Sequence, residues 1–328
     1  MKKEKELMAY VAGLMDGDGS FSIINEKRSE GDVFFPCIQL SNVFEGMTKL
    51  LHSTFGGCIK LKTIQIRAKK QQYVWNIRGF ESCKNFIENT KEFLVLKQER
   101  AEYLLKFIDK FMPPKERSFD DLGRFTKRNR SEDQTIFHFH MKARNNDCLI
   151  STEKVVKQAR KNNEDPCFWS YLAGIMDTEG SFSIRKGKAY QDCKNIRFTP
   201  LIQLSMATFE TMNFIRKNLS FGKICFPKAK TTQRGFVFKL YLVKPAECIE
   251  FIKKLLPFLK FKNTVAGILL KFCENYSPTR NKSKGVPLEE LIYRESCYDE
   301  IINENKYGFN KPSLIDSETL KLGDEGQV

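Results

Sequence analysis

At 328 residues the chain is long enough for two domains of ordinary size, and its net charge of +15 points to a polyanionic partner or to a solvated basic surface. Its ten cysteines never form a Cys-x-x-Cys pair, which excludes a simple zinc-ribbon protein. No apolar run approaches the length of a membrane span and no secretion signal opens the chain, so we expect a protein that is neither secreted nor bound to a membrane.

The first predicted element is a helix that ends in a repeated motif. Residues 10–23 (YVAGLMDGDGSFSI) and 171–184 (YLAGIMDTEGSFSI) match at one offset of 161 residues, and ten of the fourteen positions are identical. A repeat of this length indicates two copies of one structural unit. Each helix carries a face of small residues and one acid, which predicts that the two helices pack closely on each other. The predicted contact residues are Ala9, Ala12, Gly13 and Asp16 with Ser170, Ala173, Gly174 and Asp177.

Each motif helix ends beside an acidic side chain, Asp18 or Glu179. These acids lie at the negative end of the helix dipole, among carbonyls without an intrahelical partner. Two acids brought together there repel each other, and a divalent cation removes the conflict, since carboxylate and carbonyl oxygens are the ligands that Mg²⁺ prefers. The pattern therefore predicts a Mg²⁺ site. The alternative is that both acids only cap surface turns.

The rest of the first half reads as strands and helices in a regular order. Alternating residues predict strands at 20–23, 34–41, 58–64 and 73–78, and helical periodicity predicts helices at 47–54, 81–90 and 97–111. The second half repeats this order, since Ile202–Ser205 matches Ile38–Ser41 and Phe258–Lys262 matches Phe93–Lys97. Each half is thus predicted to fold as αββαββα.

The chain divides into two halves, a linker and a tail. The predicted halves are residues 1–112 and 167–275, joined by the linker 113–166, in which we predict a strand at Thr135–His140 and a capped helix at Ser151–Lys161. The tail, 276–328, is predicted to hold one helix (Leu288–Asn303) and a mobile acidic end. Its seven basic and ten acidic residues leave it at −3, so residues 1–275 carry +18. The positive charge therefore belongs to the repeated body.

The two motifs resemble the LAGLIDADG motif, which Val11–Gly19 and Leu172–Gly180 match position by position. The whole chain resembles a two-motif, single-chain LAGLIDADG homing endonuclease. The resemblance implies an α+β fold of two pseudo-symmetric halves. Each half would be a four-stranded antiparallel saddle with helices on one face and DNA on the other, and the parallel motif helices would join them. It also implies that Asp16 and Asp177 are structural, whereas Asp18 and Glu179 bind the catalytic metals.

The resemblance further implies an intron-encoded, monomeric endonuclease that cuts a specific site in double-stranded DNA. One phosphodiester on each strand would be hydrolysed across the minor groove, leaving short 3′ overhangs. Two or three Mg²⁺ ions, replaceable by Ca²⁺ or Mn²⁺, would be bound by Asp18, Glu179, Gly17 and Thr178. Lys97 and Lys262 would lie in the cleavage pocket. Such a protein is expected in a chloroplast or mitochondrion, or in the bacterial cytoplasm.

Polar and basic residues along the predicted strands are the expected contacts with DNA. Gln39 and Gln203, near the active-site ends of their strands, could position solvent as part of the catalytic set or read a base edge. Amide side chains can read adenine, and Arg or Lys can read guanine. The predicted DNA contacts are Ser20, Ser22, Gln39, Ser41, Lys60, Lys62, Asn76, Arg78, Ser181, Ser183, Arg185, Arg197, Gln203, Lys223 and Lys239.

Two alternatives to the endonuclease remain open on the sequence. The same fold could bind the RNA of a host intron as a maturase, with weak or no cleavage of DNA. It could also be a DNA-binding regulator without catalysis. The intact acids, Asp18 and Glu179, and the matched lysines, Lys97 and Lys262, favour a nuclease.

Overall fold

The computed structural model describes residues 2–29, 31–62, 71–112, 132–146, 159–188, 196–225, 237–276 and 286–307. The first half contains α1 (Lys2–Asp18), β1 (Gly19–Arg28), β2 (Gly31–Asn42), α2 (Glu45–Phe55), β3 (Cys58–Lys62), β4 (Gln72–Arg78), α3 (Phe80–Thr90) and α4 (Gln98–Phe111). The second half contains α6 (Pro166–Glu179), β5 (Gly180–Lys188), β6 (Ile196–Met206), α7 (Phe209–Asn218), β7 (Lys223–Cys225), β8 (Phe238–Leu242), α8 (Pro245–Leu255) and α9 (Asn263–Glu274). Two further helices are α5 (Glu132–Asn146) and α10 (Leu288–Tyr307).

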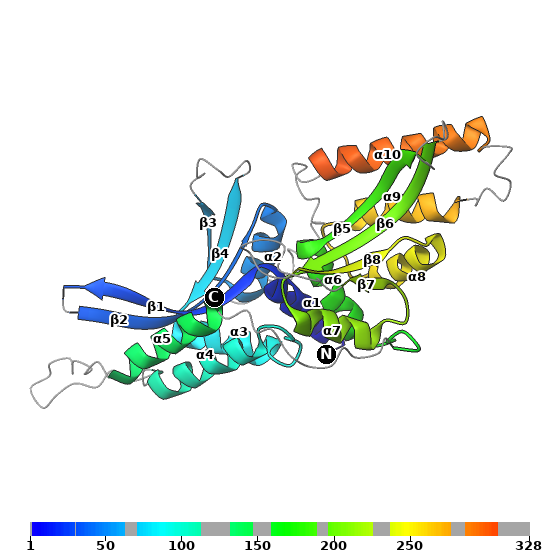
Figure 1. Cartoon of the computed structure of the whole chain (residues 1–328). Coiled ribbons are helices and arrows are strands. Elements are labelled where there is room, and N and C mark those ends of the chain that lie inside the picture. Colours follow the sequence, from blue (N-terminus) through cyan, green and yellow to red (C-terminus); the bar gives the residue numbers. More distant parts are fainter. Residues whose placement is uncertain are drawn as a thin grey trace, which may run out of the picture.

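Each half is built on a four-stranded antiparallel sheet. The strand orders are β1-β2-β4-β3 and β5-β6-β8-β7, so the two sheets have the same topology. The two sheets lie on either side of the paired helices α1 and α6 (Figure 1). The predicted α+β fold with two equivalent four-stranded antiparallel sheets is therefore confirmed. Each half closes with two helices, which makes its complete order αββαββαα.

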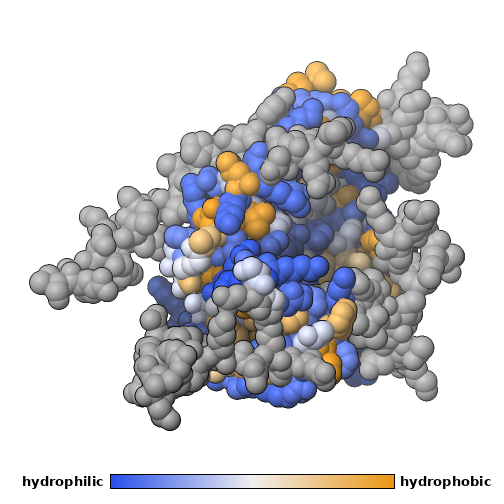
Figure 2. Space-filling model, turned by 90° about the vertical axis from the view of Figure 1, so that its left-hand side faces the viewer, coloured by the Kyte–Doolittle hydropathy of each residue, from blue (hydrophilic) through white to orange (hydrophobic). Residues whose placement is uncertain are grey.

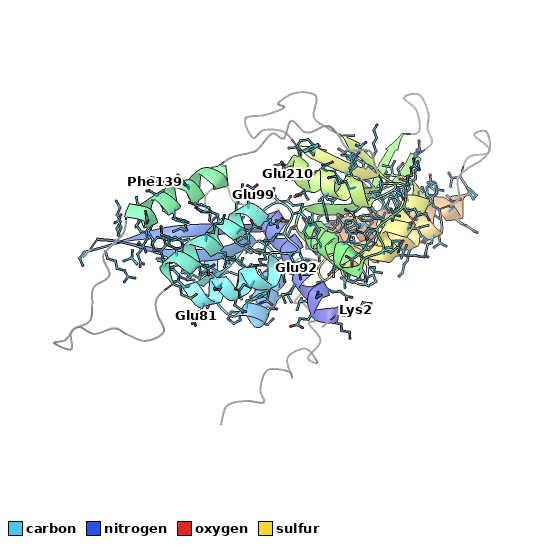
Figure 3. The ribbon with its side chains drawn as sticks, turned by 90° about the horizontal axis from the view of Figure 1, so that it is seen from below. Lys2, Glu81, Glu92, Glu99, Phe139 and Glu210 are labelled. Atoms are coloured by element: carbon cyan, nitrogen blue, oxygen red, sulfur yellow. The ribbon has the colours of Figure 1, made fainter. Side chains whose placement is uncertain are left out.

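The helices α1 and α6 pack directly on each other between the two halves, as the view from below shows (Figure 3). Their backbones meet at Gly13 and Gly174. A Cβ atom on Gly13 would lie 2.1 Å from the carbonyl oxygen of Tyr171, and one on Gly174 would lie 2.2 Å from that of Tyr10. No larger residue fits at this distance, which is why glycine stands at both matched positions. Equivalent residues meet, so the helices run parallel about a pseudo-twofold axis.

Aromatic side chains fill much of the core beneath each sheet. Phe86 of α3 packs against Phe21, Phe55 and Trp75, with ring centroids 4.6–6.4 Å apart. In the second half, Phe251 of α8 packs against Trp169 and Phe221. Seen from the side of the first half, the described surface is mainly hydrophilic (Figure 2). Buried residues alternate with accessible ones along the strands, as Phe21 does with Ser20 in β1 and Phe198 with Arg197 in β6, so the helices cover one face of each sheet.

The predicted strand at Thr135–His140 is wrong, because this segment lies within the helix α5. The polar–apolar alternation favoured a strand, but Phe137 and Met141, four residues apart, share the face of α5 that contacts the rest of the protein. Phe137 packs against Phe107 and Phe111 of α4, and Met141 is buried. Tertiary packing thus outweighs the local pattern. The predicted helix at Ser151–Lys161 falls mostly outside the described residues, and residues 159–161 are not helical.

The helices α5 and α10 occupy matching places in the two halves. The first packs on α4 and β1, and the second on α9 and β5. In each case a side chain contacts a backbone carbonyl of the edge strand: His138 Nδ1 lies 2.7 Å from the Ile23 oxygen, and Asn305 Nδ2 donates to Phe182 at 3.2 Å. The predicted tail helix thus exists and extends to Tyr307. No helix within the described part of the chain is long and apolar enough to cross a bilayer.

Candidate functional site

The first acid of each motif is a structural residue buried between the halves. The Asp16 carboxylate accepts hydrogen bonds of 2.8–3.0 Å from the backbone N–H groups of residues 95–97, just before α4. Asp177 does the same for residues 260–262, just before α9, at 2.9–3.3 Å. These N–H groups have no intrahelical acceptor, and a carboxylate near a helix N-terminus is favourable. Each acid therefore fixes the last helix of its half to the motif helix.

The lysines that precede those last helices turn back toward the ends of α1 and α6. Lys97 is 7% exposed, and its Nζ donates hydrogen bonds of 2.6–3.2 Å to the carbonyls of Met15, Asp16, Gly17 and Gly19. Lys262 Nζ donates at 2.6–3.4 Å to the carbonyls of Met176, Thr178 and Gly180. Burial lowers the pKa of both lysines to about 8, against the opposing effect of the nearby carboxylates. Each ammonium thus caps one helix C-terminus.

Asp18 and Glu179 lie at the ends of the two parallel helices and share one electrostatic environment. Glu179 is exposed by accessible surface, but the surrounding protein partly desolvates its carboxylate and raises its pKa, and the charge of Asp18 raises it further. Burial also raises the pKa of Asp18, although the hydrogen bond from Asn42 and the charges of Lys97 and Lys262 oppose this. Gly17 and Thr178, the residues before the two acids, touch each other, since a Cβ atom on Gly17 would lie 2.1 Å from Thr178 Oγ1. The two halves therefore bring Asp18 and Glu179 into one site, with a lysine beside each helix end.

The donors at this place fit a hard divalent cation. No group of three or more His, Cys, Asp or Glu side chains that could hold a metal occurs in the described ranges. The protein offers two carboxylates that repel each other and the carbonyls of Gly17 and Thr178 next to them. Mg²⁺ commonly uses one or two carboxylates and completes its octahedron with waters and substrate phosphates. The predicted ligand residues thus lie together, and this oxygen-rich donor set fits that ion.

The strand register places the predicted DNA contacts of the first half on one face of the sheet. Ser20 pairs with Gln39, which pairs with Asn76, and these residues form a row across three strands. Such paired residues point to the same face. Asn76 is only 7% exposed, so it offers little surface to a ligand. The same register brings the other predicted first-half contacts to this face: Ser22, Ser41, Lys60, Lys62 and Arg78.

The second half repeats the arrangement on its own sheet. Ser181 pairs with Gln203, which pairs with Tyr241, and Tyr241 pairs with Lys223. The amides Gln39 and Gln203 even make the same local contact, each donating to the hydroxyl two residues later, Ser41 or Ser205. The other predicted second-half contacts share this face: Ser183, Arg185, Arg197 and Lys239. The predicted basic contacts of both sheets therefore lie on the side opposite the covering helices, whereas Lys186 of β5 faces α10.

Three further residues of this site, not predicted from the sequence, hold its acids. Tyr10 and Tyr171 donate hydrogen bonds across the helix pair to Asp177 and Asp16, at 2.6 and 2.8 Å. Their matched positions in the repeat were a visible signal. Asn42, which donates to Asp18 at 2.6 Å, has no such signal, because its counterpart in the second half is a methionine.

Comparison with known proteins agrees with this arrangement. No family model matches the chain. A segment is 27% identical over 203 residues to the "Probable intron-encoded endonuclease aI3" of Debaryomyces hansenii, and the match covers 58% of this chain. The chain spans only 28% of the length of that relative.

Solved structures match nearly the whole chain. The I-SmaMI LAGLIDADG homing endonuclease bound to cleaved DNA has a TM-score of 0.59 and 16% identity, and the match covers 90% of this chain and 96% of that one. The I-LtrWI LAGLIDADG homing endonuclease bound to target DNA has a TM-score of 0.61 and 14% identity, with coverage of 92% and 98%. I-SmaMI bound to uncleaved DNA in the presence of calcium ions has a TM-score of 0.54 and 15% identity, with coverage of 90% and 98%.

The fold and the site define a pseudo-symmetric α+β protein with two saddle-type sheets and an acidic centre between its paired helices. This architecture is the LAGLIDADG homing endonuclease fold. The resemblance predicted from the two motifs is therefore confirmed at the level of the fold.

Proposed function

We propose that the protein is a site-specific endonuclease of double-stranded DNA that depends on divalent metal ions and acts as a monomer. The observation that carries this proposal is the convergence of Asp18 and Glu179 at the ends of two parallel helices. A Cβ atom on Gly17 would lie 2.1 Å from Thr178 Oγ1, so the residues that precede the two acids touch each other. Glu179 also lines one cavity together with Gly17 and Lys97. Both acids come from one chain, so a second copy is not needed to complete the site.

The geometry suits a cut in both DNA strands. Helices packed through glycine have axes about 8 Å apart, and the minor groove of B-DNA is about 6 Å wide. Acids at the ends of such helices can therefore each reach one phosphate across the groove, which would leave short 3′ overhangs. The exposed basic residues on the two sheets, among them Lys60, Arg78, Arg185 and Arg197, would bind the DNA on either side.

Hydrolysis of a phosphodiester needs an activated water and stabilisation of the charge that develops on phosphorus and on the leaving oxygen. Bound Mg²⁺ ions, held by Asp18, Glu179 and the carbonyls of Gly17 and Thr178, would supply Lewis acidity. Lys97 and Lys262 hold those carbonyls in place. Gln39 and Gln203 would position solvent at the active-site ends of their strands.

The printed names of the relatives support the same function and origin. The relative from Debaryomyces hansenii is named an intron-encoded endonuclease, and the matching structures are DNA complexes, one of them with calcium ions. We infer that this protein is also intron-encoded and that its target is the DNA site without the intron. The expected location is an organelle that carries such introns or the bacterial cytoplasm.

The test is cleavage of DNA that carries the uninterrupted host site, in the presence of Mg²⁺. We expect linear product from the wild type, and none from Asp18→Asn or Glu179→Gln, although both variants should still bind the DNA. Lys186→Ala serves as the control, because this exposed lysine lies on the face opposite Arg185 and pairs with Glu295 of α10. Intact DNA together with tight binding of the intron RNA would contradict the proposal and favour a maturase.

A further inference from the structure

The two acids of the site differ in how they are held. Asn42 Nδ2 donates a hydrogen bond of 2.6 Å to Asp18 Oδ2, and Asn42 Oδ1 accepts one of 2.7 Å from the Phe44 backbone N–H. The amide is therefore fixed at both ends and fixes one carboxylate oxygen. For Glu179, no hydrogen bond to its carboxylate comes from any residue in the described ranges.

The difference follows from one position of the repeat. Asn42 is the last residue of β2, and the last residue of β6 is Met206. The two positions are equivalent, since Gln39 and Gln203 pair in the same way with Ser20 and Ser181. A methionine has no donor, so the second half has lost the hydrogen bond that the first half makes.

An open cavity of about 420 Å³ lies beside Glu179, lined among others by Lys97, Leu96, Ser205 and Thr208. Its origin lies in two further differences between the halves. At the corresponding place beside Asp18, Phe44 packs against Phe261, with ring centroids 4.8 Å apart. The residues at the equivalent positions are Thr208 and Leu96, which are both smaller. Glu179 is consequently exposed next to open space, whereas Asp18 is half-buried.

An acid held in advance and an acid free to rotate are not equivalent in a reaction. Glu179 has one more rotatable bond than Asp18, so ordering it costs more side-chain entropy. Partners that orient a metal-binding carboxylate typically change metal affinity or activity by about 10–100-fold when they are removed. The Asp18 carboxylate is thus held in position before the substrate binds, whereas the Glu179 carboxylate becomes ordered only when the substrate binds.

We propose that the two DNA strands are cut in sequence, first at Asp18 and then at Glu179, and that the pair Asn42 and Met206 sets this order. The inference rests on the proposed endonuclease function. In each cut, the oxygen of a water molecule forms a bond to phosphorus, and the bond between phosphorus and the leaving sugar oxygen breaks. The water loses one proton, and the leaving sugar oxygen gains one. Asn42 acts in this scheme as a positioning residue for Asp18.

The first test measures the two DNA strands separately. A duplex with the target site and a different label on each strand is cut under single-turnover conditions, with a nicked intermediate expected for the wild type. Asn42→Ala and Asn42→Met should slow the earlier cut by about 10–100-fold, and Met206→Asn should speed the later one. The control is Val43→Ala, since Val43 is 36% exposed and alanine stands at the equivalent position 207. It should leave the order unchanged.

The second test does not depend on cleavage. Binding of Mn²⁺ to the protein without DNA is followed by the loss of the EPR signal of the free ion, and two unequal affinities are expected. Asp18→Asn should abolish the tighter one, and Asn42→Ala should weaken it by about 10–100-fold without changing the weaker one.

Each outcome decides a different point. Equal rates for both DNA strands in the wild type, or equal slowing of both strands by Asn42→Ala, would overturn the order. A single Mn²⁺ affinity that Asn42→Ala leaves unchanged would overturn the positioning role. A wild type that cuts no DNA would instead overturn the endonuclease function, and the Mn²⁺ titration alone would then decide whether the two acids are unequal.

Discussion

Tyr10 of α1 donates a hydrogen bond of 2.6 Å to the Asp177 carboxylate of α6, so a side chain of each half completes a buried acid of the other. Tyr171 returns the contact to Asp16 at 2.8 Å. Both acids also hold the start of the last helix of their own half. The helix pair is therefore held by polar contacts as well as by the close approach at Gly13.

The first prediction concerns this reciprocal pair. Tyr10→Phe removes one hydrogen bond to a buried carboxylate without changing the packing volume, which should lower the free energy of unfolding by about 1.5–3 kcal/mol. Tyr171→Phe should have a similar effect, because its contact is the symmetric one. Urea denaturation of both variants measures the change. A loss in one variant only would mean that the two contacts are not energetically equivalent.

A second prediction tests the close approach of the helices. Gly13→Ala would place a Cβ atom 2.1 Å from the backbone oxygen of Tyr171, so the helices must separate. The cost should reach or exceed the upper end of the roughly 1–3 kcal/mol that overpacking usually causes. Gly267→Ala in α9 is the matched control, since its Cβ would meet nothing within 4 Å. This control should gain stability, by up to about 1 kcal/mol. Equal thermal midpoints for the two variants would contradict the prediction.

The lysine caps give a third prediction. Lys97→Met leaves buried carbonyls at the end of α1 without their donor, and we expect a loss of about 1–3 kcal/mol in the absence of DNA and metal. Lys262→Met should cost less, because Lys262 contacts three carbonyls and Lys97 contacts four. Lys84→Met, which removes an exposed ion pair with Asp109, should change little. If Lys97→Met unfolded at the same temperature as the wild type, the cap would have no structural role.

The raised pKa of Glu179 leads to a fourth prediction, on pH. A carboxyl group whose pKa is higher in the folded chain stabilises the fold while it is protonated, and this contribution is lost as the pH rises through the folded pKa. Without divalent ions, Glu179→Gln should therefore match the wild type in acid and exceed it at neutral pH. Because Glu179 is exposed, the gain should be only about 0.2–1 kcal/mol.

Thermal midpoints measured across the pH range check this prediction, with Glu274→Gln as the control. Glu274 is an exposed acid that pairs with Lys253, so its neutralisation should bring no gain. Adding Ca²⁺ should stabilise the wild type more than Glu179→Gln, since an ion that binds the folded state raises its stability. A Glu179→Gln variant less stable than the wild type at neutral pH would refute the argument.

The fifth prediction separates the two faces of β5. Arg185 lies on the face with Ser183 and Gln203, whereas Lys186 lies on the other face beside Glu295 and Tyr298 of α10. If Arg185 contacts a DNA phosphate, Arg185→Ala should reduce the slope of log affinity against log salt by about 1. Lys186→Ala should leave that slope unchanged. Equal effects of the two variants would place the DNA elsewhere.

Much of the fold could be predicted because the sequence contains two copies of the same structural unit. Gly13 and Gly174 recur at the same place since both helices must approach each other there, and the strands follow from alternation within each copy. Comparing the two halves of the sequence reveals only the residues that both halves have in common. It could not find Asn42, which holds one acid only, nor the cavity that Thr208 and Leu96 leave beside the other.

Other features depend on tertiary contacts that no local pattern records. The sequence shows that Lys97 and Lys262 occupy matched positions. It does not show that their side chains turn toward carbonyls some 80 residues away in the chain. In α5, the alternation of apolar residues around His138 favoured a strand, and only the fit of Phe137 against α4 makes the segment a helix.

The helix α5 of the linker and the helix α10 of the tail each cover an edge strand of a sheet. They lie along β1 and β5, each of which is one of the two edge strands of its sheet, and contact backbone carbonyls there. An uncovered outer strand is a template on which another chain can add a strand of its own. A chain that ended after α9 would therefore keep its acids and its basic surface, but the edge of β5 would be uncovered. Copies of such a chain could aggregate by pairing strands along that edge.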